Sequence, residues 1–120
     1  MSDLLEILSA RFFCTVSGTE PVREWLKELD KDDRRIIGED IKTVEFGWPV
    51  GMPLCRSITG YKDLWEIRSK ITDGRIARVI FYIRDGQMIL LHGFIKKTQK
   101  TAPNDLDLAT KRRKEHEKNV

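Results

Sequence analysis

Residues 75–96 read Arg75-Ile-Ala-Arg-Val-Ile-Phe-Tyr-Ile-Arg84, Asp85-Gly86 and Gln87-Met-Ile-Leu-Leu-His-Gly-Phe-Ile-Lys96. The segments on both sides of Asp85-Gly86 are rich in β-branched and aromatic residues, as strands are. Asp-Gly is favoured in two-residue hairpin turns, so the sequence predicts an antiparallel hairpin here. A similar stretch over 64–71 lies upstream of Asp73-Gly74. Together the three segments predict a three-strand antiparallel meander.

Alternation along the strands indicates which side chains share a face of this meander. With Arg84 opposite Gln87, the apolar side chains of Val79, Phe81 and Ile83 fall on one face, which should lie under helices. His92 falls on that same face in this register. The other face should be open and basic. It should carry Arg68, Lys70, Arg78, Tyr82, Arg84 and, from the end of the last strand, Lys97, together with the acidic Glu66. A β-bulge would change part of the register, and Gly93 is the position where we expect one.

Outside the meander the pattern is mainly helical. A first strand is predicted over 10–17. For residues 1–9 three alternatives stay open: a short helical turn, part of a longer strand, or an irregular lead. Val22, Trp25, Leu26 and Leu29 then form one helical stripe, and a second helix is predicted over 32–46. A loop rich in Gly and Pro follows over 47–60, and Pro103 opens a third helix over 103–117. The expected fold is a single α+β domain over 1–120, in the order β-α-α-β-β-β-α, with a small antiparallel sheet and the two N-terminal helices on one face.

The charge is unevenly distributed along the chain. The formal net charge is +3 over 120 residues, made up of −3 over 1–60 and +6 over 61–120. The basic half suggests a polyanionic partner. No apolar run approaches the ~20 residues that span a membrane, and the N-terminus does not read as a secretory signal, so we expect a cytoplasmic protein. Cys14 and Cys55 should then be reduced thiols, and no spacing of ligands predicts a metal or another cofactor.

The residues of the basic face suit phosphate binding, since Arg offers forked donors and Lys a mobile charge. The alternative for any single residue is a solvated sheet face. That alternative is weaker for Arg78, which sits within an apolar strand and must find a partner or a ligand. For His92 a satisfied structural histidine is favoured over a general base. The run Lys111-Arg-Arg-Lys114 is typical of a solvated helix end, although it would extend a phosphate-binding surface.

Three segments resemble the RelE/ParE toxin superfamily, and its HigB-like, phage-derived members above all. They are Leu64-Trp-Glu-Ile-Arg68, Arg75-Ile-Ala-Arg-Val-Ile-Phe-Tyr82 and Ile89-Leu-Leu-His-Gly-Phe-Ile-Lys-Lys-Thr-Gln-Lys-Thr101, within a resemblance that runs from about Phe12 to Arg113. The resemblance implies the RelE-like fold and a toxin that cleaves mRNA on the ribosome without a metal. In such toxins the RNA 2′-hydroxyl attacks the adjacent phosphate. It also implies a helix-turn-helix antitoxin of HigA type as partner.

Carried over residue by residue, the resemblance assigns phosphate binding and charge stabilisation to Arg68, Arg78, Lys96 and Lys97. Tyr82 and His92 are further candidates for proton transfer. The sequence departs from the family's catalytic pattern, since no tyrosine follows Tyr82, and the general base stays unassigned. Further RNA contacts are expected from Lys70, Arg84, Lys100, Lys111 and Arg112. Two alternatives stay open: a ParE-like poison of DNA gyrase that is not an enzyme, and an inactive relative that binds nucleic acid or a partner protein.

Overall fold

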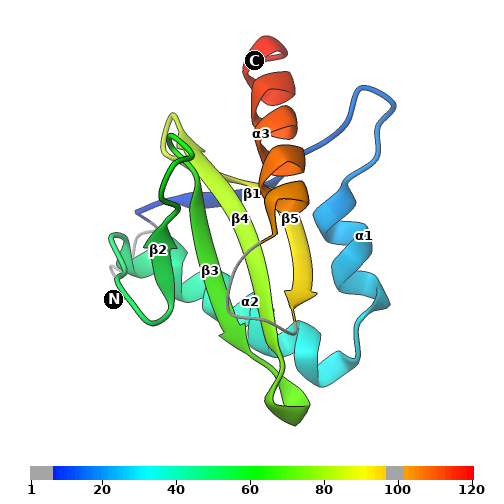
Figure 1. Cartoon of the computed structure of the whole chain (residues 1–120), viewed down its shortest axis with the longest axis vertical. Helices are drawn as coiled ribbons and strands as arrows, with labels where there is room; N and C mark the ends of the chain where they lie inside the picture. The colour runs from blue at the N-terminus through cyan, green and yellow to red at the C-terminus, as the bar shows by residue number, and fades with distance from the viewer. Residues whose placement is uncertain (1–6, 97–101) are drawn as a thin grey trace, which may run out of the picture.

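The computed structural model describes residues 7–96 and 102–120 and contains one five-stranded sheet with three α-helices (Figure 1). The elements are β1 (Ser9–Phe12), α1 (Pro21–Glu28), α2 (Lys31–Gly47), β2 (Cys55–Ser57), β3 (Trp65–Lys70), a 3-10 turn (Thr72–Gly74), β4 (Ile76–Arg84), β5 (Gln87–Lys96) and α3 (Pro103–Lys118). The strand order is β1-β5-β4-β3-β2. Within the described ranges, no helix is both long and apolar enough to cross a membrane.

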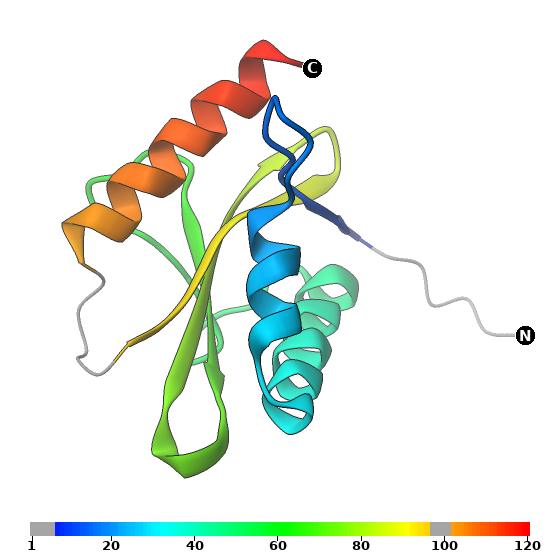
Figure 2. The same ribbon diagram turned by 90° about the vertical axis from the view of Figure 1, so that its right-hand side faces the viewer.

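The sheet lies between two layers of helices (Figure 2). On one face, α1 and α2 bury the larger core, which includes Val22, Ile37, Val79 and Phe81. On the other face, α3 covers a smaller core, to which it contributes Leu106 and Ala109. The α+β class is therefore confirmed, and so is the placement of the two N-terminal helices on one face.

Two features of the sheet differ from the sequence prediction. The first strand is shorter than 10–17 and pairs in parallel with β5, from Ser9 opposite Gln87 to Phe12 opposite Leu90. The sheet is therefore mixed rather than antiparallel. The helical hairpin after β1 and the meander after it return the chain so that β5 runs beside β1 in the same direction. The second difference is β2, which pairs with β3 inside the segment predicted to be loop.

The meander itself agrees closely with the prediction. Asp85 and Gly86 both have positive φ, at 51° and 75°, as the expected two-residue turn requires. The predicted register holds from Arg84 opposite Gln87 to Phe81 opposite Leu90. Beyond that point the pairing shifts by one, and Ile80 lies opposite His92.

The shift is a β-bulge at Leu91, so the prediction of a bulge at Gly93 is wrong. Gly93 pairs regularly with Val79. It is close to α1 instead: a Cβ at this position would lie 2.4 Å from Cε3 of Trp25. A bulge places two successive side chains on the same face. Both Leu91 and His92 therefore point toward α3, and the prediction that His92 lies under the N-terminal helices is also wrong.

Candidate functional site

The face predicted to be open is divided into a covered half and an open half. Near the β4–β5 turn, α3 packs on Ile80, Tyr82 and Leu91, and Tyr82 keeps only 3% of its surface exposed. The expectation of an open face is therefore wrong for this half. The sequence of α3 gives little sign of this docking, because only Leu106 and Ala109 of the helix are buried.

Polar contacts hold α3 on the covered half. His92 Nε2 lies 2.7 Å from Asp105 Oδ1, and its ring stacks on Phe94 with centroids 5.1 Å apart. The Nη1 group of Arg112 donates to the carbonyl of Leu91 at 2.8 Å and lies 3.4 Å from Nδ1 of His92. Burial lowers the pKa of His92. With both ring nitrogens engaged, His92 fits the structural role that the sequence favoured.

Tyr82 is directed toward α3 as well. Its hydroxyl forms a hydrogen bond with Nδ1 of His116. Burial raises the pKa of the Tyr82 hydroxyl, and the charge of Glu117 adds to the effect. A neutral phenol engaged beneath a helix is poorly placed to exchange a proton with a ligand on the open half.

The open half carries five cations contributed by four strands. Cross-strand partners share a face, so the pairs Arg56–Glu66 and Arg68–Arg78 point the same way. Ile76 of β4 pairs with Lys70 of β3 and with Lys96 of β5, so these two lysines also lie on this face. We call the resulting group the basic face, made up of Arg56, Glu66, Arg68, Lys70, Arg78 and Lys96.

A buried carboxylate lies at the centre of the basic face. Glu66 is 0% exposed, and its Oε1 lies 3.1 Å from Nη1 of Arg78 and 3.1 Å from Nε of Arg56. The Nε of Arg68 is 3.9 Å from the same oxygen. The three arginine side chains range from 1% exposed for Arg78, through 22% for Arg68, to 37% for Arg56. The partner that Arg78 was expected to need is therefore Glu66.

Sequence reasoning did not single out two members of the basic face. Alternation places Glu66 beside Arg68, but a lone acid among cations gives no sign that it is their common partner. Arg56 was missed because its strand, β2, lies in a segment rich in Gly and Pro. The pairing with β3 reveals both residues.

The remaining predicted site residues lie elsewhere. Arg84 is beside the β4–β5 turn, where its Nε is 3.7 Å from the exposed Asp85. Lys111 is exposed on α3, and the contacts of Arg112 are internal. Lys97 and Lys100 lie outside the described residues. Of the further RNA contacts expected from the sequence, Lys70 alone among the described residues shares the basic face.

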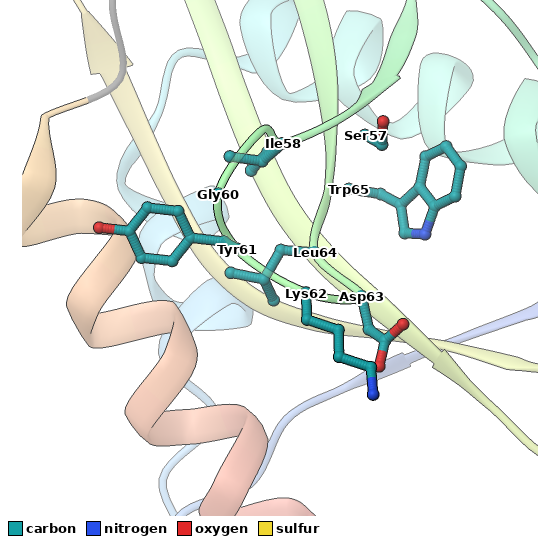
Figure 3. Close-up of a pocket in the computed structure, with 8 residues that line it drawn as sticks. All are labelled: Ser57, Ile58, Gly60, Tyr61, Lys62, Asp63, Leu64 and Trp65. Atoms are coloured by element: carbon teal, nitrogen blue, oxygen red, sulfur yellow. The ribbon is translucent and has the colours of Figure 1, made fainter.

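Two hollows flank the site without replacing it. One of about 470 Å³ lies along the loop from β2 to β3, where Figure 3 shows Tyr61 pointing toward α3 and Trp65 pointing the other way. Its charged side chains, Lys62 and Asp63, come from that same loop. The other, of about 320 Å³, lies at the edge of β3 and is lined by Arg68 and Lys70 together with residues of α2 and of the segment before β2. It continues the basic face toward the sheet edge. The part of the chain that the structure describes contains no group of three or more potential metal ligands.

A small α+β fold with a basic face on its sheet is in keeping with the RelE/HigB-type toxin class, and comparison with protein families places the chain there. The matching family model is described as phage-derived protein Gp49-like (DUF891) and covers residues 24–114, from α1 into α3. The chain belongs to this Gp49-like family. No curated protein matches the chain.

Proposed function

We propose that this protein is the toxin of a toxin–antitoxin pair and acts as a metal-independent endoribonuclease on mRNA held by the ribosome. The observation that carries the proposal is the basic face. Five cations from four strands share that face, and the buried pair of Arg78 and Glu66 lies at its centre. Membership of a toxin-like family supports the biological role.

The chemistry of the proposed reaction suits these residues. Attack of a ribose 2′-hydroxyl on the adjacent phosphate forms a 2′,3′-cyclic phosphate and breaks the P–O5′ bond, and negative charge builds up on the phosphate oxygens. Water accepts the hydroxyl proton and supplies one to the leaving O5′. Arg68 and Arg56 present guanidinium groups that are partly exposed, and Lys70 adds a mobile ammonium. Prearranged cations stabilise charge that develops in the transition state, and they also align the backbone for in-line attack. In this proposal Tyr82 and His92 have structural roles, because both side chains form hydrogen bonds with residues of α3.

Inhibition by an antitoxin completes the proposed role. The partner we propose is a helix-turn-helix protein of HigA type encoded beside the toxin. A toxin of this kind must be held inactive until the antitoxin is removed, so coexpression of the two proteins should restore growth.

The test is controlled expression without the antitoxin, followed by mapping of mRNA 5′ ends. We expect growth arrest and new ends within translated messages. Arg68→Ala should lower cleavage by at least about 100-fold, as loss of a transition-state donor does. The matched control is Arg35→Ala on α2, which removes an arginine whose side chain is 58% exposed and should leave cleavage unchanged.

Three results would contradict the proposal. DNA breaks with an SOS response and intact mRNA would identify a gyrase poison. Salt-dependent RNA binding without growth arrest would identify an inactive relative. Equal cleavage by the wild type and the Arg68→Ala variant would place the active site elsewhere.

A further inference from the structure

We propose that Glu66 is a positioning residue that orients Arg56 and Arg68 of the basic face toward a single phosphate, with Arg78 as its buried counter-charge. This inference rests on the proposed ribonuclease function and deepens it. It assigns to a buried acid the geometry of the cationic site, a role that none of the cations can fill.

The burial of Glu66 calls for an explanation beyond stability. A carboxylate with no exposed surface is costly unless charged partners compensate it. Buried ion pairs replaced by apolar residues of similar volume often give proteins that are equally stable or more stable. Ile80, the β4 residue opposite Glu66, is itself fully buried and apolar, so an apolar neighbour would suit position 66. The acid is therefore better explained by what it does to the arginines.

Without an anion the arginines would repel one another. Arg68 and Arg78 are directly opposite on neighbouring strands, and like charges in such pairs are destabilising. The single oxygen Oε1 of Glu66 lies within 3.9 Å of a nitrogen from each of the three guanidinium groups. Glu66 thus draws the like charges together from three different strands.

The contacts also set the direction of the guanidinium groups. Arg56 donates a hydrogen bond to Glu66 through Nε, the inner end of its fork. The Nε of Arg68 faces the same oxygen at 3.9 Å, an ion-pair contact without a hydrogen bond. An arginine held at Nε presents its two Nη groups outward in a fixed plane, the geometry that fits two phosphate oxygens. The partial exposure of these two side chains places that outer edge at the surface.

We expect the charge of Glu66 and its contacts with the arginines to have opposite effects on the reaction with RNA. Glu66 is the single anion of the basic face, so its charge weakens attraction for RNA while its contacts order the arginines. Glu66→Gln should lower kcat by about 100-fold, because small errors in positioning cost that much. The same substitution should leave KM for RNA unchanged or reduce it. A purely structural role would not separate the two constants in this way.

The experiment compares full-length wild type with Glu66→Gln, Glu66→Asp and Glu39→Gln in steady-state cleavage of RNA on ribosomes. Glu39→Gln removes the same charge from α2, where the side chain is 63% exposed, and should keep kcat within about twofold. Glu66→Asp keeps the charge but shortens the side chain, so it should fold even if Glu66→Gln does not. It should also lose kcat. Either Glu66 variant that folds and keeps the wild-type kcat overturns the proposal, as does a loss found in KM alone.

A second readout does not depend on cleavage. Arginine Nε–H signals in nitrogen-resolved NMR should show Arg56 protected from exchange in the wild type, because its Nε donates to Glu66 at 3.1 Å. Glu66→Gln and Glu66→Asp should each increase exchange, and inorganic phosphate should shift fewer arginine signals in the variants. Unchanged exchange and unchanged phosphate shifts would overturn the positioning role. A wild type that cleaves no RNA would instead refute the proposed function, while these signals still decide the role of Glu66.

Discussion

Replacing Gly93 with alanine should destabilise the protein by wedging α1 away from the sheet. A Cβ at this position would lie 2.4, 2.5 and 2.9 Å from Cε3, Cζ3 and Cδ2 of Trp25, where ordinary contact begins at 3.4 Å. The neighbour is a rigid ring rather than the end of a flexible side chain. The indole would therefore have to retreat by about 1 Å, taking part of α1 with it.

The expected cost follows from this geometry. Overpacking of a core contact costs about 1–3 kcal/mol, and a rigid ring argues for the upper part of that range, about 2.5 kcal/mol. For a chain of this size each kcal/mol lowers Tm by about 4 °C, so the Gly93→Ala variant should melt about 10 °C lower. The matched control is Gly38→Ala in α2, where a Cβ would meet nothing within 4 Å. That change should stabilise the protein by about 0.5–1 kcal/mol.

Thermal and urea unfolding of a double-mutant cycle with Trp25→Leu test the mechanism. Trp25→Leu removes the ring that blocks the methyl group, so Gly93→Ala should cost at least about 1 kcal/mol less in that background. The reasoning is refuted if Gly93→Ala melts within about 2 °C of the wild type. It is also refuted if the cost is the same with and without Trp25.

Three further predictions concern an ion pair, two histidines and a cysteine. Arg78→Ala should lower stability by about 3 kcal/mol, seen as a lower urea midpoint, because it leaves a buried carboxylate without its buried counter-charge; an unchanged midpoint would contradict this. Burial lowers the pKa of His92 and of His116, so the unfolded chain binds protons more readily and stability should fall as the pH drops below about 6.5. Tm should therefore be lower at pH 5.5 than at pH 7.5, and replacing both histidines with Gln should flatten that dependence. Burial raises the pKa of Cys55 to about 11, so iodoacetamide at pH 8 should label the native protein once, at exposed Cys14, and the urea-unfolded protein twice by mass spectrometry; rapid double labelling of the native protein would show the site is open.

Local patterns were enough to predict the meander and the helices. Asp85-Gly86 supplies the positive φ angles of a tight turn, which fixes the hairpin register next to it. Helix α2 was predicted over 32–46 and spans Lys31–Gly47, and β5 has the predicted bounds. The bounds of these elements are set by residues close together in the chain, so they can be predicted from the sequence.

The remaining features depend on residues far apart in the chain. The parallel partner of β1 is set by where two helices return the chain, and the three residues of β2 are hidden among glycines and prolines. The bulge at Leu91 is stabilised by Arg112 of α3, whose Nη1 donates a hydrogen bond to the Leu91 carbonyl. Helix α3 docks mainly through polar side chains, so its sequence has no apolar stripe from which the docking could be predicted.

The candidate site shows the same division. Alternation along β3 and β4 predicted that Arg68 and Arg78 share a face, and the structure confirms it. What alternation does not reveal is that α3 closes half of that face or that Glu66 joins three arginines. Both features depend on packing between elements that are distant in the sequence, so only the structure reveals them.

The pairing of β1 with β5 also bears on how the chain folds. The meander of β3, β4 and β5 closes short loops, whereas β1 must find a strand that lies near the other end of the sequence, with Ser9 opposite Gln87. Closing so long a loop costs entropy that local hairpins do not incur. During synthesis β1 leaves the ribosome before the meander that contains its partner strand. We expect the N-terminal segment to remain unpaired until the meander has formed, so β1 should be the last strand to gain protection from hydrogen exchange.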